Sequence, residues 1–112
     1  LGLRRRPPEP TDAGEITVEG LYDRLREVVE ALGAHAIEGE VRGVRESKRH
    51  NVYFTLHVGP LALQCRLSSS MARALPRPVE REQLRVRGVP TVFGSRGEVQ
   101  FDVIGLEAAV AG

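Results

Sequence analysis

Apolar residues recur at two spacings along this chain, first at the period of a helix and then at the period of a strand. After Thr17, apolar side chains appear every three to four positions, and Gly33 follows as a stop signal. This stretch predicts an amphipathic helix with Thr17 as its N-cap, one buried face, and Tyr22 packed in the core. The stripe consists of Val18, Leu21, Tyr22, Leu25, Val28, Val29 and Leu32.

Beyond the helix the apolar period becomes two, which indicates half-buried strands. Strands are expected over residues 37–42, 52–58, 61–67, 83–93 and 98–106. The residues expected to point inward are Ile37, Gly39, Val41, Val52, Phe54, Leu56, Val58, Leu61, Leu63, Cys65, Leu67, Leu84, Val86, Val99, Phe101 and Val103. Such alternation places the intervening residues on the outer surface of a sheet.

Turn and cap signals separate these strands. Residues 59–60 (Gly-Pro) and 94–97 (Gly-Ser-Arg-Gly) predict turns. The serines at 68–70 offer N-caps for a short helix through Leu75, which the prolines at 76 and 78 end. Gly88, inside the fourth strand, predicts a bend or bulge.

The order of elements is helix, three strands, short helix, two strands. We therefore predict an all-β protein with minor α content, a five-stranded OB-fold barrel whose short helix lies between the third and fourth strands. An SH3-like barrel has the same number of strands but lacks a helix at that point. Residues 1–14, rich in Arg and Pro, predict a flexible tail, and residues 15–112 predict one OB-fold domain.

Composition narrows the function classes. The single cysteine, Cys65, excludes an internal disulfide framework, and no apolar run approaches the ~20 residues of a membrane span. With no signal peptide, we expect a cytoplasmic protein that has no membrane partner. Cys65 is expected to be a buried, inert thiol, and the three histidines are not at metal-ligand spacing. We expect no catalytic residue, metal or cofactor in this domain.

Charge is segregated along the chain, although the net charge is only +1. Residues 42–49 carry four cations and one anion, whereas residues 19–30 carry four anions and two cations. Arginine supplies 15 of the 16 cations, which favours bidentate phosphate contacts but is equally explained by genomic base composition.

The predicted fold brings these features to one groove. OB-folds bind ligands on the face of strands two and three, between the loop joining strands one and two and the loop joining strands four and five. The candidate nucleic-acid-binding residues are Arg42, Arg45, Lys48, Arg49, His50, Tyr53, Thr55, Gln64, Arg66, Phe93 and Arg96. Tyr53 is the firm base-stacking candidate, worth ~1–3 kcal/mol. About four phosphate contacts give a log–log salt slope near −3 for a single strand.

The ordered motifs also carry a family resemblance. They are Thr17-Val18 before the Leu21/Leu25 helix, residues 37–41 (Ile-Glu-Gly-Glu-Val), residues 52–56 (Val-Tyr-Phe-Thr-Leu), residues 63–65, residues 86–88, and residues 96–100 (Arg-Gly-Glu-Val-Gln). With them, residues 16–106 resemble the N-terminal OB-fold domain of the exodeoxyribonuclease VII large subunit. The resemblance implies single-stranded DNA binding within a hydrolase that degrades single-stranded DNA. It also implies a separate nuclease domain downstream and several small subunits, bound through regions outside this sequence.

Two other functions remain open at this point. The domain could be a protein-interaction or scaffolding module whose helical face docks a partner. It could also bind structured RNA, since nothing in the sequence distinguishes the 2′-hydroxyl.

Overall fold

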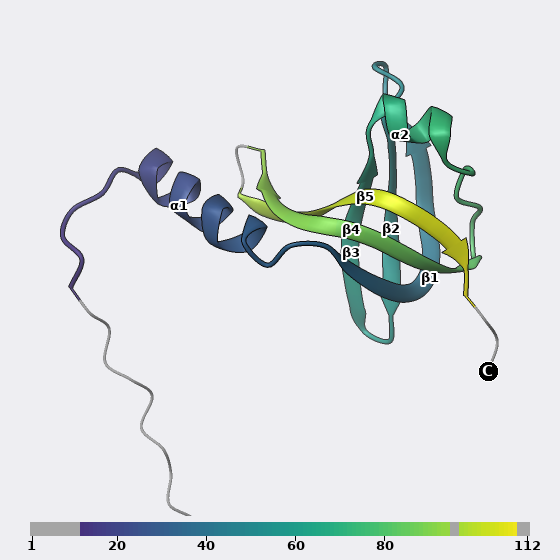
Figure 1. The fold of residues 1–112 in the computed structure, drawn as a ribbon, viewed down its shortest axis with the longest axis horizontal. Coiled ribbons are helices and arrows are strands. Elements are labelled where there is room, and N and C mark those ends of the chain that lie inside the picture. The colour runs from purple at the N-terminus through teal and green to yellow at the C-terminus, as the bar shows by residue number, and fades with distance from the viewer. Residues whose placement is uncertain (1–11, 95–96, 110–112) are drawn as a thin grey trace, which may run out of the picture.

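The computed structural model describes residues 12–94 and 97–109. Two helices and five strands follow one another as α1 (Val18–Glu30), β1 (His35–Glu46), β2 (Val52–Val58), β3 (Leu61–Leu67), α2 (Ser69–Ala74), β4 (Gln83–Phe93) and β5 (Glu98–Ala108). The strands form a closed barrel in the order β1-β2-β3-β5-β4, with α2 between β3 and β4 (Figure 1). The predicted OB-fold is confirmed. Most of the tail predicted for residues 1–14 lies outside the described residues.

Strand pairing closes the barrel through one parallel contact. β3 pairs with β5 in parallel, whereas the β1–β2, β2–β3, β1–β4 and β4–β5 pairs are antiparallel. The β4–β5 register shifts between Arg87 and Gly88, which confirms the predicted bulge. A Cβ at Gly88 would lie 2.6 Å from the Asp102 carbonyl oxygen, so the two strands approach too closely there for any side chain.

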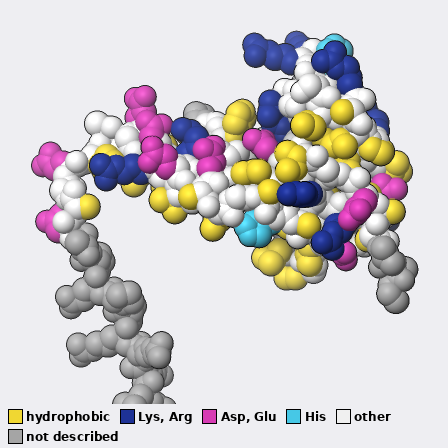
Figure 2. Space-filling view, in the orientation of Figure 1, with side chains coloured by type: hydrophobic (Ala, Val, Ile, Leu, Met, Phe, Trp, Pro, Cys, Tyr) yellow, Lys and Arg dark blue, Asp and Glu magenta, His cyan; other side chains and the backbone are white. Residues whose placement is uncertain are grey.

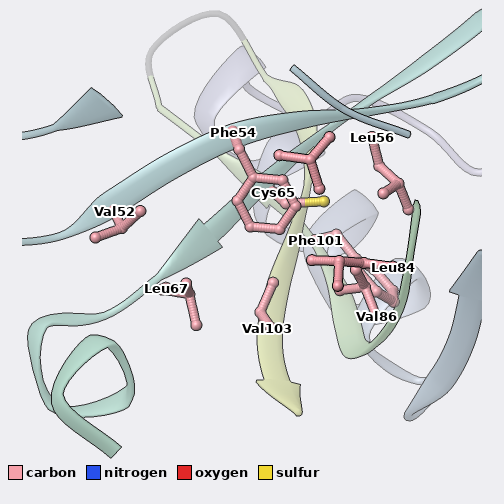
Figure 3. Packing of buried hydrophobic residues seen from close by; sticks show 10 residues of the cluster. Val52, Phe54, Leu56, Cys65, Leu67, Leu84, Val86, Phe101 and Val103 are labelled. Carbon is pink, nitrogen blue, oxygen red and sulfur yellow. The ribbon is translucent and has the colours of Figure 1, made fainter. Parts of the chain in front are cut away.

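The core fills the inside of this barrel (Figure 3). It consists of Val41, Val52, Phe54, Leu56, Cys65, Leu67, Leu84, Val86, Phe101 and Val103, all predicted to point inward. Three other inward predictions are wrong, because Val58, Leu61 and Val99 are 49%, 72% and 52% exposed. Each lies at the end of a hairpin. There the apolar and polar residues still alternate, but among the described residues no strand on the opposite side of the barrel covers the apolar side chains.

Helix boundaries follow the predicted caps. The Thr17 side chain accepts a hydrogen bond from Gly20 N at 3.0 Å, and the Ser68 hydroxyl accepts one from Met71 N at 3.3 Å. Each bond satisfies a free N–H of the first helical turn. Gly33, with φ of +75°, then turns the chain from α1 into β1.

The expectation that α1 buries one face is wrong. None of its residues is buried, and Val18, Leu21, Leu25 and Val28 are 43% to 71% exposed. Figure 1 shows α1 projecting from the barrel beside the end of the β4–β5 hairpin. Tyr22 is half-buried against Gly97 of that hairpin, outside the core. The amphipathic pattern is real, but the described residues provide little surface to cover it.

Two polar contacts fix α1 at the free edge of β4. Pairing between β1 and β4 begins at His35 and Gly88, so the later residues of β4 have no β1 partner. Arg26 Nε donates to the Val92 carbonyl at 2.9 Å, and Thr91 Oγ1 donates to Glu30 Oε1 at 2.8 Å. The first contact satisfies an edge carbonyl that a neighbouring strand would otherwise use, and the second joins two side chains. Neither described helix has the length and apolarity needed to cross a membrane.

Candidate nucleic-acid interface

One row of side chains crosses four strands on the outer surface of the barrel. Arg45 on β1 is paired with Tyr53 on β2, Tyr53 with Arg66 on β3, and Arg66 with Asp102 on β5. Directly paired residues project to the same side of a sheet. The Arg45 guanidinium lies 5.4 Å from the centre of the Tyr53 ring, a cation–π distance. The row therefore places one aromatic ring between two arginines.

A second, more polar row lies alongside it. Arg42, Thr55, Gln64 and Gln100 are paired in sequence across β1, β2, β3 and β5. Thr55 and Gln64 are half-buried, and Gln100 is only 5% exposed. We call the outward side chains of Tyr53, Thr55, Gln64 and Arg66 the β2–β3 face. It is a shallow surface of hydrogen-bonding groups around a single ring.

Two arginines predicted to contact nucleic acid already have carboxylate partners. Arg42 Nε lies 2.7 Å from Glu40 Oε1, and this hydrogen bond holds the pKa of Glu40 below its ordinary value, so Glu40 is ionised at neutral pH. Arg66 Nη1 lies 3.7 Å from Asp102 Oδ1. Arg66 Nε is buried with no hydrogen-bond partner among the described residues, which is unusual for a buried donor. The charge of both arginines is thus largely compensated within the domain.

The loop between β1 and β2, residues 47–51, forms one border of the β2–β3 face. Ser47 N donates to the Asn51 carbonyl at 2.8 Å, and His50, with φ of +65°, closes the turn by donating to the Ser47 carbonyl at 2.9 Å. The turn leaves Lys48, Arg49 and His50 exposed at its tip. This 47–51 loop contributes the dark blue group at the top of Figure 2.

The β4–β5 turn borders the opposite end of the face. Because β3 and β5 run in parallel, with Gln64 beside Gln100, the start of β5 lies toward the β2–β3 hairpin and away from the 47–51 loop. Phe93, at the end of β4, is 51% exposed. Arg96, the other residue predicted for this border, lies outside the described residues. The sequence did not predict that α1 packs against this turn through Tyr22 and Gly97.

Cations without a carboxylate partner gather at the 47–51 loop end of the barrel. Arg45, Lys48, Arg49 and Arg73 form no ion pair with any described carboxylate. By contrast, a hollow of about 570 Å³ on the β1–β4–β5 side has Arg85 in its lining, and Arg85 is paired with both Glu38 and Glu107. Four cations without an ion pair therefore lie at the 47–51 loop end, whereas the described lining of the larger hollow has one such arginine, Arg87.

Two observations concern metal binding and thiol chemistry. No group of three or more His, Cys, Asp or Glu side chains within residues 12–94 and 97–109 could hold a metal ion. Cys65 is buried, and burial raises the pKa of its thiol to about 12. A thiol with that pKa stays protonated and unreactive at neutral pH.

Comparisons with known proteins agree with the fold and the resemblance. A family model described as an OB-fold nucleic acid binding domain matches residues 16–107. The chain is 37% identical over 94 residues to the exodeoxyribonuclease 7 large subunit of Geobacter sulfurreducens, and equally to that of Geobacter metallireducens. Each match covers 82% of this chain but 21% of the relative, so the chain spans about a fifth of the relatives' length.

Solved structures share the fold at low sequence identity. One is a replication protein A heterotrimer bound to ssDNA, with a TM-score of 0.58 and 14% identity, covering 70% of this chain and 59% of that one. Another is the aspartyl tRNA synthetase from Entamoeba histolytica, with a TM-score of 0.56 and 16% identity, covering 73% of this chain and 20% of the synthetase. At these identities the likeness establishes the barrel alone.

Proposed function

Because this chain belongs to the family of OB-fold nucleic acid binding domains, we propose that it binds single-stranded DNA across the β2–β3 face. The observation that carries this proposal is the row formed by Arg45, Tyr53 and Arg66. Single strands bind where a positively charged groove runs beside an aromatic platform, since every base has a face that can stack. Tyr53 supplies the platform, and Arg45, which has no carboxylate partner among the described residues, lies beside it for a backbone phosphate.

The β2–β3 face favours single strands over sequence-specific duplex recognition. Its elements are strands and a short loop, and none of them presents a helix to a major groove. Thr55 and Gln64 offer hydrogen bonds to base edges, but they are half-buried and few. We expect weak, sequence-tolerant, salt-sensitive binding.

Titration of a labelled single-stranded oligonucleotide, followed by fluorescence anisotropy, tests this proposal. Tyr53→Ala should weaken binding by about five- to 150-fold, since one base stack is worth ~1–3 kcal/mol. Tyr53→Phe is the matched control, because it keeps the ring and should bind nearly as well as the unchanged chain. Equal binding by the Ala and Phe variants, or a preference for duplex, would refute the proposal. A competing RNA strand of the same sequence separates DNA from RNA binding.

We further propose that the parent protein acts as an exodeoxyribonuclease VII large subunit, in which this domain delivers single-stranded DNA to a nuclease domain elsewhere. The support is the 37% identity to the Geobacter large subunits. On this proposal the small subunits contact regions outside this chain. The full-length protein, assembled with its small subunit, should degrade single-stranded DNA. The isolated domain should neither cut DNA nor retain the small subunit in a pull-down.

Two observations favour a second candidate function, the docking of a partner protein. The α1 stripe is exposed, and a hollow of about 430 Å³ at the β2–β3 hairpin is lined only by apolar residues. These residues are Ile37, Leu56, Val58, Leu61, Ala62 and Leu63. Apolar surfaces of this kind mark interaction sites. Light scattering with and without the small subunit tests this function, and a complex with the isolated domain would favour it over the DNA-binding proposal.

A further inference from the structure

A third hollow lies between the 47–51 loop and α2. Its volume is about 380 Å³, and it is lined by Glu46, Arg49, His50, Ser69, Ala72 and Arg73. Its walls come from the loop and from α2, which are about twenty residues apart in the sequence. The sequence predicted only the loop side as a binding region. Apart from Ala72, every lining side chain is polar or charged.

A hydrogen bond between the walls holds the hollow in place. Asn51 Oδ1 accepts from Ser69 N at 3.0 Å, which ties the end of the loop to the first turn of α2. Asn51 N in turn donates to Ser47 Oγ at 3.2 Å, and Ser68 caps α2. The backbone segments that carry Arg49 and Arg73 are therefore held beside each other by the fold before any ligand arrives.

The electrostatics of the hollow favour an anion. Its one carboxylate, Glu46, is shared by Arg77 at 3.5 Å and by His50 at 3.6 Å, the latter pair being charged when the imidazole is protonated. Arg49 and Arg73 have no such partner among the described residues. Two free guanidinium groups beside a compensated carboxylate leave net positive charge. Guanidinium groups bind phosphate oxygens in a bidentate manner.

The hollow lies past the 47–51 loop from the Tyr53 row. Glu46, in its lining, is paired with the buried Val52, so these two residues project to the opposite side of the β1–β2 hairpin from Arg45 and Tyr53. A strand stacked on Tyr53 reaches the hollow by passing the exposed tip of the 47–51 loop. The lining offers no Phe, Tyr or Trp ring, and its two free arginines suit the phosphate backbone.

We propose that the DNA-binding track continues past the 47–51 loop, and that Arg49 and Arg73 together bind one backbone phosphate in the hollow. This inference rests on the proposed single-strand binding at Tyr53 and names the element that extends it, α2. The contact is independent of base identity. It is used only by strands long enough to span from Tyr53 to α2.

Oligonucleotide length makes the proposal testable. Arg73→Gln and Arg49→Gln are each titrated with oligonucleotides of about four and about twelve nucleotides, lengths within the range of OB-fold sites. A phosphate contact contributes about 0.7 to the log–log salt slope, so losing it should lower affinity for the longer strand about fivefold at about 0.1 M salt. Arg73→Gln should leave the shorter strand unaffected. Arg87→Gln, which removes one charge from the β1–β4–β5 side, is the control and should change neither affinity.

The double variant tests whether both arginines hold the same phosphate. If they do, Arg49→Gln with Arg73→Gln should cost less than the product of the two single losses, because the second change removes a contact already lost. Independent, multiplicative losses would overturn the shared phosphate. An Arg73→Gln protein that binds the longer strand normally, while Tyr53→Ala does not, would overturn the inference and leave the proposed function standing. If Tyr53→Ala also binds normally, both fail.

Discussion

The salt dependence of single-strand binding follows from which cations are free. The perturbation is a change of KCl concentration during titration with a long single-stranded oligonucleotide. The sequence alone predicts about four phosphate contacts, with Arg42 among the cations of the loop region. In the structure Arg42 is already paired with Glu40, so it has little uncompensated positive charge left to neutralise a phosphate.

The structure lowers the number of contacts to three. Among the described residues, Arg45, Lys48, Arg49 and Arg73 are the free cations at the 47–51 loop end, and they give three phosphate contacts because Arg49 and Arg73 are proposed to share one phosphate. At about 0.7 per phosphate the log–log slope is about −2.1. Affinity should therefore fall about twenty-fold between about 50 and about 200 mM salt.

Fluorescence anisotropy at several salt concentrations measures this slope directly. Arg49→Gln should reduce its magnitude by about 0.7, and Arg87→Gln should leave it unchanged. A slope near zero would refute electrostatic binding altogether. A slope of about −3.5 would show that Arg42 and Arg66 contribute despite their carboxylate partners, and the reasoning from ion pairs would then be wrong.

Three further predictions concern the barrel that carries the interface. Phe54→Ala removes a fully buried ring and should lower the free energy of unfolding by about 3–5 kcal/mol in urea denaturation; a loss under about 1 kcal/mol would contradict its place in the core. Gly88→Ala should lower the free energy of unfolding by about 1–3 kcal/mol, because the new Cβ meets the Asp102 carbonyl. Gly105→Ala is the matched control, since the nearest atom to its new Cβ lies at 3.6 Å. Equal melting temperatures of the two variants would refute the close approach at Gly88. Because burial raises the pKa of Cys65 from 9.0 to about 12, only the unfolded chain loses this proton between those values. The free energy of unfolding should then fall by about 1.4 kcal/mol per pH unit above pH 9.0, and a Cys65→Ala chain with the same pH slope would contradict this.

The barrel was predictable because strand alternation is a local signal. The bounds of β2 and β4, the caps at Thr17 and Ser68, and the bulge at Gly88 all appear in the structure as the sequence indicates. Each depends on residues within a few positions of one another. The order of these elements was then enough to separate the OB-fold from an SH3-like barrel.

Burial at the ends of elements was less predictable, because it depends on what lies opposite. Leu61 and Val99 continue the alternation of their strands, yet they lie past the part of the barrel that faces another wall. The α1 stripe has helical spacing, but spacing cannot show whether the same chain supplies a surface to cover it. In each case the pattern identifies the apolar side of an element and not its partner.

The candidate site was also predictable only in part. Tyr53 and Arg45 could be placed on one surface from strand alternation and the loop position. The pairing of Arg66 with Asp102 could not, because it depends on the parallel contact between β3 and β5. Arg73 was missed because its position beside the 47–51 loop is set by a bond between Asn51 and Ser69, 18 residues apart.

Mapping of amide chemical shifts by NMR, as an unlabelled single-stranded oligonucleotide is added, tests the central claim most directly. Binding across the β2–β3 face predicts the largest shifts at Tyr53, Thr55 and Gln64, with smaller ones in the 47–51 loop. Residues around the β1–β4–β5 hollow, such as Ala36 and Arg87, should stay unchanged. Shifts concentrated at that hollow or along α1, with Tyr53 unaffected, would contradict the account.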